Sequence, residues 1–329
     1  MAKIDTDEWE ARAWEGVLVE VPPEWDIAAI SGERKRGYMR IDDQDNMPRV
    51  EVKWQESKGF VNVDEVIEKY LKDLQKKRPP DADPVEVDHD CTVVSKRQMR
   101  KRDLNCFAWH EEISGYGAAW YCEDCERAMV IQVMVKPEED GQDLAAEVIG
   151  NMEDHPVDGW VTWSTYGLKF QTPERFDLSQ QKLMAGLIEL TFEDSGEQIV
   201  AARWGMANIA LGGGSLEGWA EREIKQFHKG VRLEFEQTQF RGHPAVHVTG
   251  TFVNPLRYFQ SFVMHVLRRP YAEVVNGWAW HSEEENRIYY VGTLLDEKNT
   301  DIAEEIARRV DCPEGEVGEE DEHEGKPIR

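Results

Sequence analysis

Segments in which apolar and polar residues alternate recur along the chain in two series, about 150 residues apart. Residues 16–26 open the first series and residues 167–177 open the second. Each opening begins with a glycine, reaches a proline, and continues to an aromatic residue followed by aspartate, as in Trp25–Asp26 and Phe176–Asp177. This pattern predicts a β-strand that ends in a proline turn at the start of each series.

The elements that follow have the same order in both series. They are two strands (37–41 and 50–54; 186–190 and 200–204), an amphipathic helix (63–74; 216–227), two strands around an acidic tip (120–122 and 129–135; 280–282 and 288–294) and a closing helix (143–149; 301–307). Alternation with period two predicts the strands, and apolar residues three or four positions apart predict the helices. We therefore predict an α+β protein of two tandem repeats, each a twisted antiparallel sheet with helices packed on it.

A run containing proline and glycine separates the two series. Helical periodicity stops near Asn151, and Pro156 and Gly159 follow, so the domain boundary is expected near residue 158. The predicted organisation is an N-terminal extension at 1–13, a first repeat at 14–158, a second repeat at 159–310, and an acidic, disordered tail at 311–329.

The strand, proline and aromatic opening of each series resembles the PsbP-like superfamily, which includes Mog-type Ran-binding proteins and DcrB-type lipoproteins. The segment that matches best is Tyr166–Phe176, and the similar order of elements extends over both halves of the chain. Members of this superfamily are mostly small binding or assembly proteins without catalysis, so the resemblance implies a non-enzymatic role. The matching positions are strand and turn residues, so no binding residue is carried over.

The charge of the chain narrows the range of partners. There are 39 Lys and Arg residues against 65 Asp and Glu, a formal net charge of −26, and no basic stripe of the kind that binds a polyanion. We therefore predict no nucleic-acid partner. No run of about 20 apolar residues is present, and the first residues have no apolar signal-peptide core, so we expect a cytoplasmic protein without a membrane contact. The five cysteines are expected to be reduced thiols.

One motif points to specific chemistry. The Cys122-Glu123-Asp124-Cys125 sequence has the CxxC spacing with which two thiolates chelate zinc, or with which one thiol resolves a disulfide formed by the other. A zinc site needs further ligands, and the sequence candidates are Cys91, Cys106, His89 and His110. A third interpretation is a polar hairpin tip with two incidental thiols. The second series has Ser282-Glu283-Glu284-Glu285 at the same place.

An insertion in the second series carries the only cluster of basic and aromatic residues. It lies between Gly250 and Trp278. We predict a partner-binding surface formed by Tyr258, Phe259, Phe262, Arg268, Arg269 and Tyr271, with His265 among them. An extended strand with a longer turn is the alternative.

Three hypotheses about function follow. The first is a non-enzymatic cytoplasmic binding or assembly protein with a protein partner, because the sequence contains no recognisable nucleophile motif or full metal-ligand set. The second is a zinc-binding protein with its site at Cys122 and Cys125, and otherwise no cofactor is expected. The third is a small-ligand binder or hydrolase with a cleft between the repeats. No catalytic residue is assigned.

Overall fold

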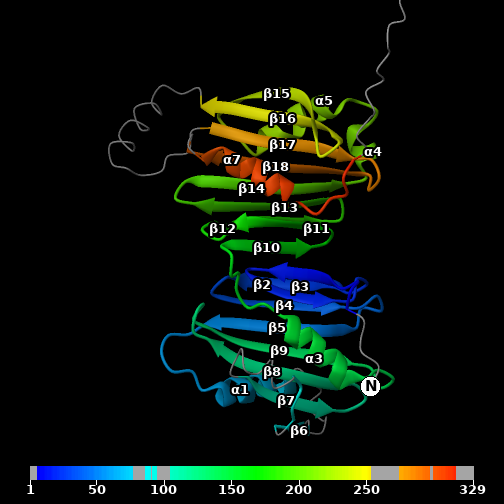
Figure 1. Cartoon of the computed structure of the whole chain (residues 1–329), viewed down its shortest axis with the longest axis vertical. Helices are drawn as coiled ribbons and strands as arrows, with labels where there is room; N and C mark the ends of the chain where they lie inside the picture. Colours follow the sequence, from blue (N-terminus) through cyan, green and yellow to red (C-terminus); the bar gives the residue numbers. More distant parts are fainter. Residues whose placement is uncertain are drawn as a thin grey trace, which may run out of the picture. The chain divides into compact units, whose positions relative to one another are not determined.

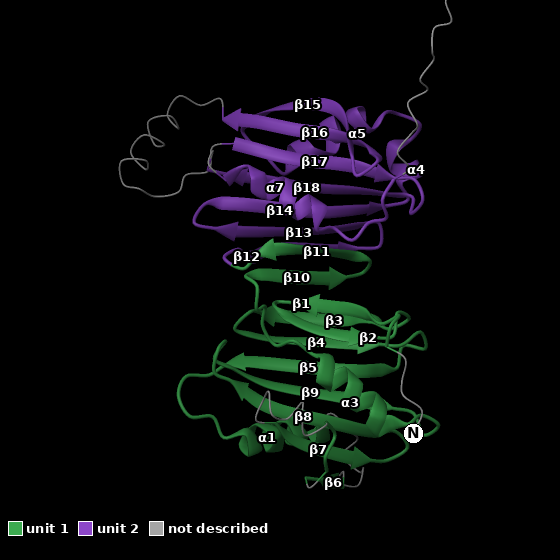
Figure 2. Ribbon diagram, in the orientation of Figure 1, with its two compact units in different colours: residues 1–174 green, residues 175–329 purple. Residues whose placement is uncertain are grey.

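The computed structural model describes residues 6–76, 86–89, 91–94, 104–252, 274–296 and 299–315. The chain forms two compact units, residues 1–174 and residues 175–329 (Figure 2). In the described residues no helix is long and apolar enough to cross a lipid bilayer.

Strands are more numerous than helices in unit 1. They are β1 (Glu10–Trp14), β2 (Val17–Val21), β3 (Asp26–Glu33), β4 (Arg36–Asp42), β5 (Pro48–Glu56), β6 (Val87–Asp88), β7 (Asn105–His110), β8 (Ser114–Cys122), β9 (Arg127–Val135), β10 (Trp160–Thr165) and β11 (Leu168–Pro173), with helices α1 (Val63–Lys76) and α3 (Gly141–Asn151). Asn62 caps α1 by accepting a hydrogen bond from the backbone N–H of Asp64 at 3.1 Å.

Unit 2 repeats this plan with longer strands and shorter helices. Its elements are β12 (Asp177–Met184), β13 (Leu187–Asp194), β14 (Glu197–Gly205), α4 (Ala207–Leu211), α5 (Leu216–Glu223), the 3-10 turn η1 (Ile224–Gln226), β15 (Val231–Phe240), β16 (His243–Phe252), β17 (Val274–Ser282), β18 (Arg287–Leu295) and α7 (Asp301–Arg308). Ser215 caps α5 by accepting a hydrogen bond from the backbone N–H of Gly218.

The seven-stranded sheets of the two units have the same strand order. It is β3-β4-β5-β9-β8-β7-β6 in unit 1 and β12-β13-β14-β18-β17-β16-β15 in unit 2, and all neighbours are antiparallel (Figure 1). The strands predicted at 37–41 and 50–54 are present as β4 and β5, and all four predicted helices are present. Most neighbours in this order are consecutive strands, but β5 pairs with β9 and β14 pairs with β18, and the other strands of each sheet lie between these partners in the chain.

A third, four-stranded sheet belongs to unit 1. Its order is β11-β10-β1-β2, so the hairpins that open the two series pair with each other through β1 and β10. Ala13 stands opposite Ser164, whose hydroxyl donates a hydrogen bond to the Ala11 carbonyl oxygen at 2.6 Å. The sequence predicts the strands β2 and β11, but it predicts neither β1 and β10 nor this pairing.

The helices α1 and α3 pack on opposite faces of the seven-stranded sheet of unit 1. Side chains alternate along a strand, so Val130 and Met134 of β9 share one face, and they pack in a cluster with Ile67 and Tyr70 of α1. Ala118, Trp120 and Cys122 of β8 point to the other face, where α3 and the segment after it lie. This division places α1 and Cys122 on different sides of the sheet.

The predicted fold class is wrong. Of the residues that the structure describes, 51% lie in strands and 19% in helices, in three sheets, which is a sheet-rich fold rather than an α+β, PsbP-like one. Among the described helices the longest is α1 with 14 residues, whereas strands reach 10 residues and carry the core. The stripe of apolar residues predicted the helices but overstated how much of the core they form.

Three of the segments set by the predicted domain limits have a described structure. Residues 10–13, predicted as part of an extension, lie in β1, and residues 160–173 lie in unit 1. Residues 311–315, which begin the predicted tail, are held by Arg241, whose guanidinium donates to the carbonyl oxygens of Val310 and Cys312 at 2.7 Å each. Residues 316–329 lie outside the described residues.

Candidate metal centre

Cys122 and Cys125 lie at the tip of the β8–β9 hairpin. Cys122 ends β8, Cys125 lies in the turn, and Arg127 begins β9 opposite Cys122. Glu126 adopts a left-handed backbone conformation with φ of 52°, which closes the turn and returns the chain into β9. Both thiols are half-buried, and all five cysteines of the chain are reduced.

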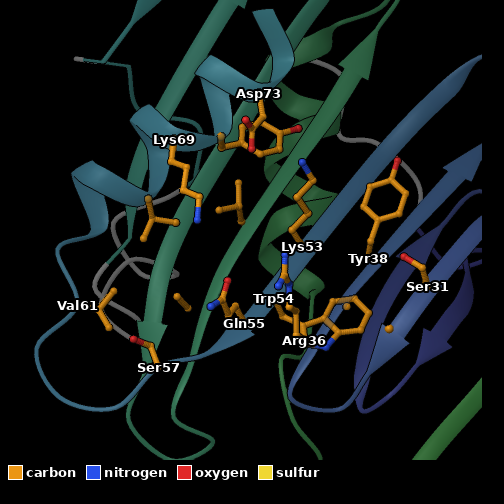
Figure 3. Close-up of a pocket in the computed structure, with 16 residues that line it drawn as sticks. Ser31, Arg36, Tyr38, Lys53, Trp54, Gln55, Ser57, Val61, Lys69 and Asp73 are labelled. Carbon is orange, nitrogen blue, oxygen red and sulfur yellow. The ribbon is translucent and has the colours of Figure 1, made fainter. Parts of the chain in front are cut away.

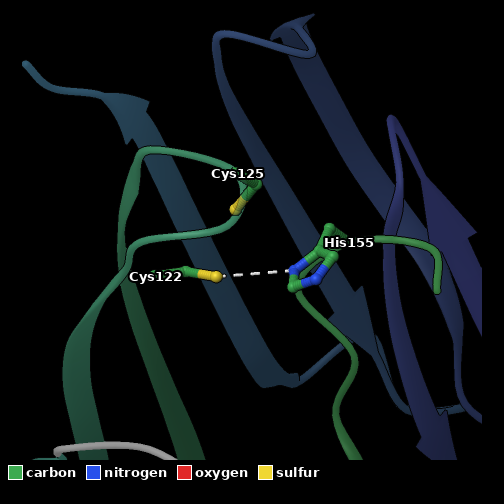
Figure 4. A group of neighbouring side chains, drawn as sticks. All are labelled: Cys122, Cys125 and His155. Carbon is green, nitrogen blue, oxygen red and sulfur yellow. Dashed lines mark hydrogen bonds between the residues drawn. The ribbon is translucent and has the colours of Figure 1, made fainter.

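A histidine from a distant segment joins the two thiols. His155 follows α3, and its Nδ1 lies 3.5 Å from Cys122 Sγ (Figure 4). The donor atoms of Cys122, Cys125 and His155 all lie within 4.8 Å of one another. In a tetrahedral zinc site, with Zn–S of about 2.3 Å and Zn–N of about 2.0 Å, neighbouring ligand atoms are about 3.5 to 3.8 Å apart. The Cys122–His155 separation therefore already has the length of one edge of such a site.

The side chain before His155 fixes the position of this segment. Trp120, on the same face of β8 as Cys122, donates its indole N–H to Asp154 Oδ2 at 2.6 Å, and both residues are buried. The other oxygen of Asp154 lies 2.8 Å from His155 Nδ1, and Asp124 Oδ2 of the hairpin turn lies 3.9 Å from His155 Nε2. His155 Nδ1, the nitrogen nearest Cys122, thus also contacts Asp154, whereas Nε2 faces Asp124.

Arg127 connects the hairpin tip to its surroundings. Its guanidinium is buried and donates to Cys125 Sγ at 3.4 Å, to the carbonyl oxygen of Glu15 at 3.2 Å, to that of Arg34 at 3.1 Å, and to that of Asp154. One planar cation thus holds the residue before His155 and one of the thiols together.

The cluster borders solvent on one side. A pocket of about 200 Å³ is lined by Cys125, Arg127 and His155, together with residues of the β1–β2 turn. It is large enough for a water molecule, so a fourth ligand position can be filled from solvent.

The protonation of Cys122 opposes a redox role. Burial, and to a smaller degree the charge of Asp154, raises the pKa of the Cys122 thiol to about 11, although the backbone N–H of Cys125 acts in the other direction. The thiolate is the nucleophile in disulfide exchange, so a reactive cysteine needs a lowered pKa. Cys122 therefore lacks the lowered pKa of a nucleophilic cysteine in a redox-active pair.

The other ligands suggested by the sequence are not part of this cluster. In the part of the chain that the structure describes, the group of three contains His155 in place of Cys91, Cys106, His89 and His110. Cys106 is buried in β7, and His110 contacts the hydroxyl of Ser114 at 3.0 Å. The sequence pattern did not indicate His155, because the proline and glycine within residues 151–159 are typical of a linker. The predicted partner surface at Tyr258–Tyr271 lies outside the described residues.

No protein-family model matches the chain, and no curated protein does either. Two solved structures are similar to the chain, both of the immunity protein TplEi of the type VI secretion system of Pseudomonas aeruginosa, one in complex with an "L" peptide and one without. In each case the TM-score is 0.32 and the identity 8%, over 93% of this chain and 98% or 97% of the other.

Proposed function

We propose that the protein binds one zinc ion through Cys122, Cys125 and His155, and that this ion has a structural role in unit 1. The observation that carries the proposal is the convergence of two thiols from one hairpin and one imidazole from a segment 30 residues later in the chain. Thiolate and imidazole ligands favour zinc over magnesium or calcium, which bind oxygen ligands.

The role we assign to the ion is to fasten the segment after α3 to the β8–β9 hairpin. Without a metal, this segment is held at that point by Trp120, Arg127 and the backbone pairing of Leu18 with Glu153 at 2.9 Å. A zinc ion adds bonds from both sides of the same junction, so metal binding stabilises the folded unit. Because thiolate ligands must stay reduced, the proposal fits the cytoplasmic location predicted from the sequence.

Elemental analysis of the full chain, purified without added metal, tests the proposal. We expect about one zinc per chain in the wild type, and loss of the metal in Cys122→Ser and Cys125→Ser. His155→Asn should weaken zinc binding at least about tenfold, measured by competition with a chelator. Cys91→Ser is the matched control, since Cys91 lies outside the cluster, and it should retain the metal.

Cobalt substitution adds a readout of geometry. Co²⁺ bound by two thiolates and an imidazole in a tetrahedral site gives a thiolate-to-cobalt charge-transfer band and intense visible bands, which should vanish in Cys122→Ser. A wild type with far less than one metal per chain that also fails to bind added zinc, or equal metal content in Cys122→Ser and Cys91→Ser, contradicts the proposal.

The partner-binding surface remains a second proposal. It rests on the basic and aromatic residues between Tyr258 and Tyr271, which stand out in a chain of net charge −26. Capture of a specific protein by the wild type, lost in Phe259→Ala with Arg268→Ala, supports it. A partner that binds this double variant as tightly as the wild type contradicts it.

A further inference from the structure

A cavity of about 530 Å³ lies on the α1 face of the sheet in unit 1. Residues of β3, β4, β5 and β9 form its floor, and α1 forms one wall (Figure 3). Pockets of this volume are typical of sites for small molecules. The three proposed zinc ligands are not among its lining residues, so the cavity is a separate feature of the fold.

Three cationic side chains line the cavity. Arg36 comes from β4, Lys53 from β5 and Lys69 from α1, and in Figure 3 Lys69 reaches from the helix toward the sheet while Lys53 extends from the sheet. Asp73 is the only carboxylate among the described lining residues, and it forms an ion pair with Lys76 at 3.0 Å. The cavity is therefore positively charged within a strongly acidic protein.

Apolar and aromatic side chains form the rest of the wall. Val66 of α1 and Val130 of β9 contribute methyl groups, and Tyr70 of α1 contributes its ring. Lys53 Nζ lies 4.6 Å from the centre of the Tyr70 ring, which places an ammonium group beside an aromatic surface. This combination accommodates a ligand that has both a negative charge and a flat apolar body.

Hydrogen bonds hold the aromatic wall in place. Glu51 accepts from the Tyr38 hydroxyl at 2.6 Å, from the Tyr70 hydroxyl at 3.0 Å and from Gln132 Nε2 at 3.0 Å. Gln132 in turn accepts from the indole N–H of Trp109 at 3.2 Å. Because Tyr38 and Tyr70 each have a fixed partner, the cavity is formed before a ligand binds, which lowers the entropic cost of binding.

The pairing of the strands shows which residue of unit 2 corresponds to Gln55, a residue that lines the cavity in unit 1. Gln55 pairs with Ala128, the residue after the start of β9, whereas Trp204 pairs with Ile288, the residue after the start of β18. Trp204 therefore occupies in unit 2 the place that Gln55 occupies in unit 1.

In unit 2 the residue at the corresponding position, Trp204, fills the space between the sheet and α5. Trp204 contacts Trp219 of α5 with their ring centres 4.8 Å apart, and both belong to a buried cluster with Ile288 and Tyr290. Two residues before Trp204, Ala202 stands in the register of Lys53. The same face of one architecture is thus hydrophobic core in unit 2 and a cation-lined cavity in unit 1, which is the difference expected if unit 1 accommodates a ligand there.

We propose that the cavity beside α1 in unit 1 binds a small organic anion, a carboxylate or a phosphate ester attached to a flat apolar or aromatic group. Lys53, Lys69 and Arg36 bind the anionic group, and the apolar body lies between α1 and the sheet. An ammonium or guanidinium group forms a charge-assisted hydrogen bond with either kind of anion, so the two chemistries share one site.

Calorimetric titration of the full chain tests this with three probes of one shape: 1-naphthoate, 1-naphthyl phosphate and the neutral 1-naphthamide. At least one of the two anions should bind at one site per chain, at least about tenfold more tightly than the amide. The stronger of the two anions identifies whether the cavity is adapted to a carboxylate or to a phosphate ester.

Variants distinguish anion binding in this cavity from non-specific binding to cations on the protein surface. Lys53→Met and Lys69→Met should each weaken anion binding about fivefold or more, whereas Lys182→Met, which removes an exposed cation of β12, should leave it unchanged. Arg36→Met, at an exposed lining position, serves the same purpose if Lys53→Met lowers the stability of unit 1.

A variant with a large side chain in the cavity tests whether the anion binds there. Gln55→Trp places in unit 1 the residue that unit 2 has at this register, and it should abolish anion binding while the protein stays folded by circular dichroism. Equal affinity for the amide and the anions, no binding of either anion, or unchanged binding in the Lys53→Met, Lys69→Met double variant overturns the proposal.

Discussion

The guanidinium carbon of Arg49 lies 4.2 Å from the centre of the Trp25 ring, in the interior of unit 1. Arg49 is 2% exposed, and it forms ion pairs with Asp43 at 3.2 Å and Glu139 at 2.6 Å. Its Nε also donates to the carbonyl oxygen of Met134 at 3.0 Å. A single buried cation thus joins β5 to the turn before β5, to the end of β9 and to the residues before α3.

Replacing this cation should destabilise unit 1 severely. Arg49→Met keeps the apolar stem but removes a partner of both Asp43 and Glu139, and Asp43, whose side chain is 7% exposed, keeps only its ion pair with Lys136 at 3.0 Å, so we expect a loss of about 3 kcal/mol in the free energy of unfolding. Urea denaturation followed by tryptophan fluorescence measures it. Arg308→Met, which breaks an ion pair with Glu304 on the surface, should cost less than about 1 kcal/mol, and equal losses in the two variants would contradict this account.

A glycine in β8 is required by the aromatic residue opposite it. Gly117 pairs directly with Phe107 of β7, and a Cβ at residue 117 would overlap the Phe107 ring. Gly117→Ala should therefore lower the free energy of unfolding by about 1 to 3 kcal/mol through overpacking. Thermal denaturation compares it with Gly186→Ala, where nothing lies within 4 Å of the added Cβ and little change is expected. Wild-type stability in Gly117→Ala would contradict this packing.

Local patterns predicted the four helices and many of the strands, but not how they combine. Apolar positions identified β4, β5 and β9, of which β9 is buried along almost its whole length because helices cover both faces of the sheet there. The pairing of β1 with β10 joins segments about 150 residues apart and leaves no local signature. For the same reason the third sheet was missed.

Matching residues 50–54 with 200–204 in the sequence makes Trp54 and Trp204 equivalent, but the strand pairing in the structure shows that they are not. Trp54 pairs with Met129 and donates its indole N–H to the Glu33 carbonyl oxygen at 2.9 Å, and because side chains alternate along β5, its side chain points to the face opposite that of Lys53 and Gln55. Trp204 points to α5 in unit 2. A shift of one residue moves a side chain to the other face of a sheet, so the alignment hid the cavity beside α1.

The candidate metal centre was predicted in part. The CxxC spacing identified Cys122 and Cys125, because two thiols three positions apart in a turn can meet one ion. His155 lies beside the two thiols because Trp120 and Arg127 donate hydrogen bonds to Asp154, which hold the segment after α3 against the β8–β9 hairpin. That contact depends on tertiary structure, and Pro156 beside it made the segment look like a linker.

Residues 312–315 of unit 2 should become more mobile when the guanidinium group of Arg241 is replaced by an ammonium group. Arg241→Lys keeps the charge but cannot donate to the carbonyl oxygens of Val310 and Cys312 at once. We expect faster amide exchange at residues 312–315 and faster alkylation of Cys312, which is 5% exposed, measured by mass spectrometry. Alkylation of Cys106, buried in unit 1, is the internal control. Unchanged labelling of Cys312 would contradict this role of Arg241.

Acid should weaken unit 2 through a buried histidine. His228 is 3% exposed, its Nε2 lies 2.7 Å from the Tyr290 hydroxyl, and burial lowers the pKa of His228 to about 4 from an ordinary value near 6.5. Between these two values the unfolded chain binds more protons than the folded one. The stabilising contribution of neutral His228 is therefore complete above pH 6.5 and is lost as the pH falls toward 4.

The size of this effect is set by the difference between the two pKa values. It amounts to about 3 kcal/mol when the pH falls from 7 to 4, because each pKa unit corresponds to about 1.4 kcal/mol. His228→Gln, which retains a hydrogen-bonding group for Tyr290 but does not titrate, should lose less stability over this range than the wild type. His110→Gln, at an exposed histidine, should behave as the wild type does. Urea denaturation at pH 7 and pH 4.5 gives the comparison, and the same pH dependence in wild type and His228→Gln would show that this histidine is not the group responsible.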